Sequence, residues 1–123
     1  AIESVSSPKE KMVKYIESCF TWLEKNRDDV KAWFFFFYIC GSDKSLRQLH
    51  NDLTSMGRDR IVALITLMSE PKTHATEKLK VKAKMVQRLI TGALNELLTE
   101  LEPSDILEVR KQIVHQCLKI ITE

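Results

Sequence analysis

Histidines and cysteines are the side chains best suited to bind metals or act as nucleophiles, and this chain has three of each. His50, His74 and His115 lie far apart, and neither a His-x-x-x-His nor a Cys-x-x-Cys spacing occurs. His115 and Cys117 are two residues apart, which places them on different faces of a helix. No glycine-rich phosphate loop and no nucleophile motif is present. We therefore expect no enzyme activity, catalytic residue, metal site or cofactor.

The cysteines indicate a reducing compartment. Cys19, Cys40 and Cys117 are an odd set, and each lies in an apolar stretch, as expected of reduced and buried thiols. The start of the chain is polar, so we expect no signal peptide. The longest apolar run, residues 32–40, is too short to span a bilayer. These features predict a cytoplasmic protein.

A run of aromatic residues provides the best candidate for a ligand pocket. Large flat side chains and one hydroxyl gather between residues 33 and 38, and they suit a hydrophobic ligand with one polar group. Apolar residues and a histidine further along the chain could close the pocket. The candidate ligand-binding residues are Trp33, Phe34, Phe37, Tyr38, His50, Met56, Met85 and Leu89. The alternative is that these residues form an ordinary core, which is the more common role for any one of them.

Composition predicts that helices position these residues. Three glycines and three prolines are few for a turn-rich β architecture, and 44% hydrophobic with 29% charged residues is an ordinary globular balance. No repeat, low-complexity segment or interior linker is visible. We expect one all-α domain over residues 1–123.

Five helices are expected from the apolar spacing and the caps. The first begins at Pro8, with Ser7 and Glu10 as a capping box, and ends near residues 25–26. The second runs from residue 28 or 29 to 40, with Gly41 expected in the left-handed conformation. It is apolar on every face, so we expect other segments to surround it. The remaining helices are expected over residues 43–69, which Pro71 terminates, over 73–101, and from 103 or 104 to the end.

The last two helices carry more apolar positions than one core-facing stripe needs. The second stripe indicates a partner, and the simplest arrangement is a two-fold dimer in which these helices form a four-helix bundle between subunits. The alternative is that both stripes are buried within a monomer. Candidate interface residues are Leu94, Leu98, Leu107, Val114, Leu118 and Ile121.

Several segments together resemble the C-terminal domain of the tetracycline-repressor (TetR) family. They are residues 7–22 (SPKEKMVKYIESCFTW), the turn at 26–29 with the aromatic helix at 33–38, residues 46–53 and 57–61, and the junction at 102–105. The resemblance covers nearly the whole chain. It implies the five-helix fold of that domain, a pocket among the central helices, and a bundle of the last two helices across the two-fold axis. It also implies a transcriptional regulator, in most cases a repressor, which a small hydrophobic effector controls.

The resemblance also defines what this chain is expected to lack. The family reads operator DNA through an N-terminal helix-turn-helix unit, and nothing in residues 1–123 resembles it. We expect DNA binding only through that unit, because the net charge of +2 is low and the basic cluster at residues 78–88 suits a solvated helix face. Two alternatives remain: a small helical protein–protein interaction adaptor without a pocket, and a free-standing carrier of hydrophobic ligands.

Overall fold

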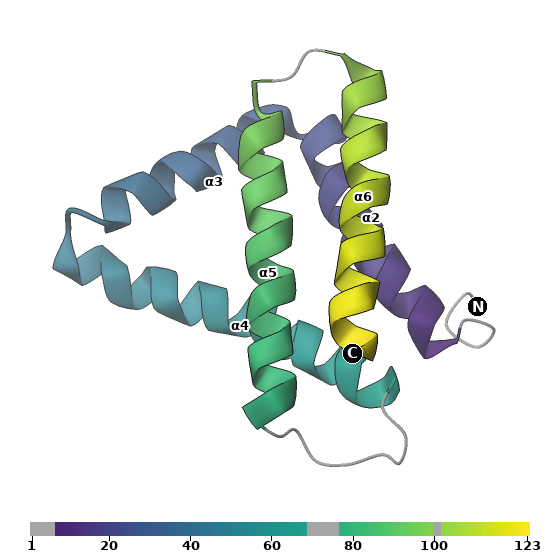
Figure 1. The fold of residues 1–123 in the computed structure, drawn as a ribbon. Helices are drawn as coiled ribbons and strands as arrows, with labels where there is room; N and C mark the ends of the chain where they lie inside the picture. The colour runs from purple at the N-terminus through teal and green to yellow at the C-terminus, as the bar shows by residue number, and fades with distance from the viewer. Residues whose placement is uncertain (1–6, 69–76, 100–101) are drawn as a thin grey trace.

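A computed structural model describes residues 7–68, 77–99 and 102–123, and the helices in these ranges are the only regular structure. They are α2 (Pro8–Lys25), α3 (Arg27–Cys40), α4 (Lys44–Met68), α5 (Glu77–Leu97) and α6 (Pro103–Thr122) (Figure 1). The predicted all-α class is confirmed. The expected stop at Pro71 and the start of the fourth helix at residue 73 lie outside the described residues. The expected end of that helix at residue 101 is wrong, since α5 ends at Leu97 and residues 98–99 form a turn, where Arg27 bonds the carbonyls of Leu97 and Leu98. No helix in the described ranges has the length and apolar character needed to cross a membrane.

The predicted start of α2 is confirmed in detail. Ser7 has an extended backbone (φ −68°, ψ 162°), and its hydroxyl accepts a hydrogen bond of 3.2 Å from the Glu10 amide. Pro8 occupies the first helical position, where its missing N–H leaves no bond unmade. The cap places the apolar face of α2 against the core through Met12, Ile16, Phe20 and Leu23, which are fully buried.

The core lies between α2, α4, α5 and α6. In Figure 1, α5 and α6 stand side by side as an antiparallel pair, with α2, α3 and α4 behind them. The largest buried face belongs to α5, where buried positions recur at helical spacing from Leu79 to Leu97. Ile61 and Ile65 of α4 join this cluster. No polar or charged residue in the described part of the chain is fully buried, so apolar packing holds these four helices together.

The C-terminal ends of α5 and α6 are each capped by a cation from another helix. The Arg27 guanidinium at the start of α3 donates to the carbonyl oxygens of Leu97 and Leu98, at 2.9 and 2.7 Å. The Lys82 ammonium donates to the Ile121 carbonyl at 2.9 Å. Carbonyls in the last turn of a helix lack partners within the helix and carry its negative dipole end, so both contacts are favourable. The Arg27 contact holds the start of α3 at the end of α5, and the Lys82 contact holds the end of α6 beside α5.

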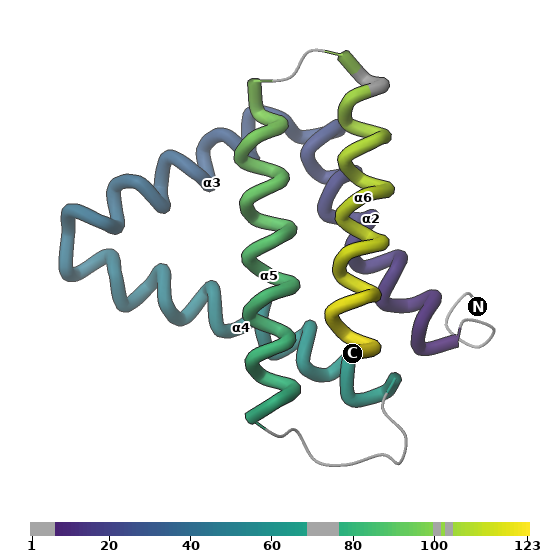
Figure 2. The backbone as a smooth tube through the Cα atoms, viewed as in Figure 1, coloured from purple at the N-terminus to yellow at the C-terminus, as the bar shows by residue number. Residues whose placement is uncertain are grey.

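α3 and α4 form a V that projects to one side of the α5–α6 pair, as the tube in Figure 2 shows. The expected left-handed conformation of Gly41 is wrong, since Gly41 has φ −65° and ψ −25°. The reason is that the last turn of α3 tightens: the Gly41 and Ser42 amides donate to the carbonyls of Tyr38 and Ile39, three residues back. Asp43 then starts α4, with its carboxylate accepting from the Ser45 amide and hydroxyl.

The expectation that other segments surround α3 is also wrong. Of its residues, Val30 and Cys40 are buried, whereas Phe35 is 64% exposed and Tyr38 77% exposed. The cause is the V, because α3 contacts only α2 and α4 closely and its outer face meets no described segment of the chain. Its inner face is therefore the part that can contribute to a site.

Two phenylalanines provide a test of this core. We expect Phe20→Ala to lower the free energy of unfolding by about 3–5 kcal/mol, because Phe20 is fully buried and the change leaves a cavity. Phe35→Ala is the matched control, with an expected change within about 0.5 kcal/mol. Urea unfolding followed by circular dichroism measures both. Similar losses in the two variants would mean that α3 is packed as deeply as α2.

Candidate functional site

A cavity of about 550 Å³ lies between α3, α4 and α5, on the inner side of the V. α3 provides Trp33 and Phe37, and α5 provides Gln87, Arg88, Thr91 and Gly92. α4 provides the other wall, with His50, Leu53, Thr54, Gly57 and Arg58. Its volume is within the range of small-molecule sites, and its walls combine aromatic surface with a few polar groups, as such sites do.

Phe37 is the centre of the aromatic wall. Its ring lies 4.3 Å from the His50 ring in an edge-to-face arrangement, and 5.1 Å from the Trp33 ring. Phe34 packs edge-on against it from the core side, at 5.5 Å. Such pairs add about 0.5–1.5 kcal/mol each beyond the burial of their surface. The cluster therefore holds the inner face of α3 at a fixed distance from α4.

The crossing of α4 and α5 forms the floor of the cavity. Gln87 of α5 donates through its amide nitrogen to the Thr54 carbonyl at 2.9 Å and accepts from Nε of Arg58 at 3.2 Å. A β-carbon on Gly57 would lie 3.3 Å from that same amide nitrogen, so glycine allows the close approach. The floor is consequently polar, and residues of both helices determine its geometry.

Two polar atoms of α4 at this cavity lack hydrogen-bond partners. Nε2 of His50 and Oγ1 of Thr54 are buried and make no hydrogen bond with any described residue. Leaving such an atom unpaired typically costs about 1–3 kcal/mol, and natural proteins have few of them. Both atoms belong to residues that line the same cavity. They are the groups that a bound molecule would satisfy.

The predicted ligand-binding residues divide into three that line the cavity and five that do not. Trp33, Phe37 and His50 line it. Phe34 and Leu89 pack against the core instead, and Tyr38, Met56 and Met85 point to solvent. Sequence reasoning missed the polar lining, namely Thr54, Arg58, Gln87, Arg88 and Thr91. The spacing of His50, Thr54 and Arg58, each four residues from the next, was the available signal.

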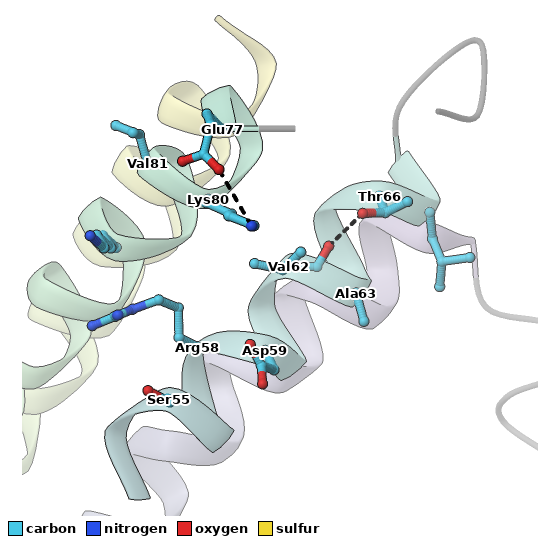
Figure 3. Close-up of a pocket in the computed structure, with 11 residues that line it drawn as sticks. Ser55, Arg58, Asp59, Val62, Ala63, Thr66, Glu77, Lys80 and Val81 are labelled. Atoms are coloured by element: carbon cyan, nitrogen blue, oxygen red, sulfur yellow. Dashed lines mark hydrogen bonds and ion pairs between the residues drawn. The ribbon is translucent and has the colours of Figure 1, made fainter. Parts of the chain in front are cut away.

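A larger cavity of about 880 Å³ lies between the second half of α4 and the first half of α5. Figure 3 shows its lining, with Arg58 of α4 reaching toward α5 and Lys80 paired with Glu77 at 3.4 Å. Its walls come from two helices and carry charges of both signs, with Asp59 and Glu77 among them. It lacks the aromatic wall, and neither unpartnered buried atom lies in it. We therefore regard the cavity under α3 as the candidate site.

The predicted dimer-interface residues lie in three environments. Leu94 and Ile121 are buried within the core of one chain, Leu98, Val114 and Leu118 are half-buried against it, and Leu107 is exposed. Leu107 and Val114 share a side of α6 with Arg110, which pairs with Glu24 of α2 at 3.8 Å. This line therefore faces α2. On the opposite side, Val109 and Gln112 lie beside Glu96 of α5.

No group of three or more potential metal ligands exists among the described residues. The three cysteines are free in this structure; Cys40 and Cys117 are buried as predicted, and Cys19 is half-buried. Burial, and secondarily the neighbouring Cys19, raises the pKa of Cys117 to about 11. Burial also raises the pKa of Cys19. A raised thiol pKa leaves less thiolate near neutral pH, which makes both groups poor nucleophiles.

We expect Cys19 and Cys117 of the folded protein to react with iodoacetamide near neutral pH much more slowly than in the unfolded chain. The reason is that the thiolate is the reactive form, and folding both shields these groups and raises their pKa. Peptide mass spectrometry after timed labelling measures each site, and labelling in guanidinium is the control. Equal rates for Cys117 in both states would show that the core beneath α6 opens readily.

The chain was also compared with known proteins. No protein-family model, curated protein or solved structure matches it.

Proposed function

We propose that this chain is the effector-binding and dimerisation domain of a TetR-type transcriptional regulator, in which a small hydrophobic effector controls DNA binding by an N-terminal helix-turn-helix domain. The observation that carries the proposal is the cavity between α3, α4 and α5, with an aromatic wall and two unpartnered polar atoms, His50 Nε2 and Thr54 Oγ1.

The position of the cavity supports a sensing role. Its floor is the crossing of α4 and α5, and α5 also presents Met85 to solvent, away from its buried positions. A second copy bound to that outer face would be connected to the cavity through one rigid helix. An effector that prefers one α4–α5 arrangement would then shift how two subunits sit together, which is the way ligands act on two-state proteins.

A second candidate function, the protein–protein interaction adaptor, is supported by a different surface. Phe35, Tyr38 and Ile39 are exposed together on the outer face of α3. Exposed apolar groups that cluster in this way are typical of interaction sites. The adaptor does not use the cavity, so a ligand-binding experiment separates the two functions.

The neutral fluorescent dye phenylnaphthylamine is a suitable probe of the cavity. We expect it to bind with one site per chain, and we expect Thr91→Phe to weaken binding by at least about tenfold, because Thr91 lines the cavity and the larger ring would fill it. Thr66→Phe is the matched control, since Thr66 lines the larger cavity between α4 and α5. Fluorescence titration measures both, and circular dichroism checks that each variant is folded.

Each outcome bears on the proposal. Loss of binding in the Thr91 variant alone supports the cavity as the effector site. Loss in the Thr66 variant alone would place the ligand in the other cavity and overturn this assignment. Absence of saturable binding to the parent protein would favour the adaptor.

The dimer is tested by sedimentation velocity. We expect the parent chain to sediment at twice the mass of one chain and Met85→Glu to dissociate it, because a charge would be buried in the bundle. Leu107→Glu is the comparison variant: the sequence predicted Leu107 for the interface and it is 41% exposed, against 43% for Met85, but it lies on the side of α6 that faces α2, so we expect the dimer to survive this change. Dissociation by Leu107→Glu alone would show that the interface lies on the side of α6 that carries Leu107 and Val114, and not at Met85. A parent chain that is monomeric at micromolar concentration would contradict the dimer.

A further inference from the structure

The charges around the cavity under α3 have one sign. Two arginines line it, Arg58 from α4 and Arg88 from α5, and no aspartate or glutamate is among its lining residues. The larger cavity differs, because both acidic and basic side chains line it. A site with this lining disfavours a cationic ligand and attracts an anionic one.

Both arginines keep donors available. Arg58 uses Nε to bond Gln87, which orients the guanidinium, and no bond from its terminal nitrogens to a described residue is seen. Arg88 makes no hydrogen bond or ion pair with the described residues. Guanidinium groups bind carboxylates through paired N–H donors, so an anion between the two helices would find matching groups on both sides.

The unpartnered atoms supply the second observation. His50, Thr54 and Arg58 lie four residues apart on one face of α4, so their polar groups form a line along the cavity. Oγ1 of Thr54 can donate to an oxygen, and so can Nε2 of His50 when it carries a proton. Trp33 and Phe37 face this line from α3, with rings that offer no strong acceptor. The cavity thus has a polar, cationic side and an apolar side.

We infer that the occupant of this cavity is an amphipathic organic anion: a carboxylate joined to an aromatic or acyl body. The carboxylate lies between Arg58 and Arg88 and takes hydrogen bonds from Thr54 or His50. The apolar body lies against Trp33, Phe37 and Leu53. This inference rests on the proposed function, since it names the chemical class of the effector for the same site.

Two dyes with the same ring system test the role of charge. Anilinonaphthalene sulfonate carries a negative charge as a surrogate for the carboxylate, and phenylnaphthylamine is its neutral counterpart. We expect the double substitution Arg58→Gln with Arg88→Gln to raise the Kd of the sulfonate by about tenfold and to change the Kd of the neutral dye by less than about twofold. Added salt should weaken only the binding of the sulfonate.

Two further variants keep the test decisive. Arg88→Gln alone removes no hydrogen bond or ion pair within the described chain and changes an exposed residue, so it should fold normally, and we expect it to raise the sulfonate Kd by about threefold. Arg60→Gln is the matched control, an exposed arginine on α4 that lines neither cavity, and it should change neither Kd.

The outcomes separate this inference from the proposed function. An unchanged sulfonate Kd in the double variant overturns the inference, and so does an equal loss of both dyes, which would mean that the arginines maintain shape rather than charge. In either case, loss of the neutral dye in Thr91→Phe would still support the cavity as the effector site. If Thr91→Phe leaves both dyes bound, the proposed site itself is wrong.

Discussion

The close crossing of α4 and α5 is the constraint on which the candidate site depends. Gly57 lacks the β-carbon that would meet the Gln87 amide at 3.3 Å, and this amide bonds the Thr54 carbonyl while its oxygen holds Arg58. Helices that approach at a glycine and are joined by a side-chain amide do not slide continuously past one another, so a change in the crossing is a step from one packed arrangement to another. α3 is then positioned from both ends, by Arg27 on the last carbonyls of α5 and by the contact of Phe37 with His50. The cavity is the space that these fixed points leave between the three helices.

Local signals predicted most of the fold correctly. Ser7 and Pro8 begin α2 as expected, because capping depends on residues within one turn. The same local reasoning was wrong for the end and the surroundings of α3. The conformation of Gly41 depends on how α4 starts, through Asp43, and not on α3 alone. Apolar residues on all faces of α3 indicated that the helix packs against other groups on every side. They could not show whether those groups belong to the same chain, to another molecule or to a ligand.

The candidate site was predicted less completely than the fold. Trp33, Phe37 and His50 were identified by type, whereas Met56 and Met85 have the same apolar character and point to solvent. Helical periodicity assigns a residue to a face, but the angle between helices decides which faces meet. Arg88 shows the difficulty, because a cation in a lysine-rich helix is expected on a solvated surface, and only the approach of α3 and α4 gives it a cavity to line. Of the predicted interface residues, Leu94 and Ile121 are buried within the core of one chain and Leu107 is exposed, because apolar spacing alone does not say which stripe of a helix turns toward the core.

Arg58 lines both cavities on the two sides of the crossing. Its guanidinium has a limited number of N–H donors, and a group that binds them on one side removes them from the other. Occupation of the two cavities is therefore a linked equilibrium, in which each occupant changes the affinity for the other by the same factor. Acidic and basic side chains of the larger cavity, among them Asp59 and Lys84, act on the same guanidinium as Arg88 of the cavity under α3. Salt screens these interactions, so the ionic composition of the surrounding solution is itself an input to the site.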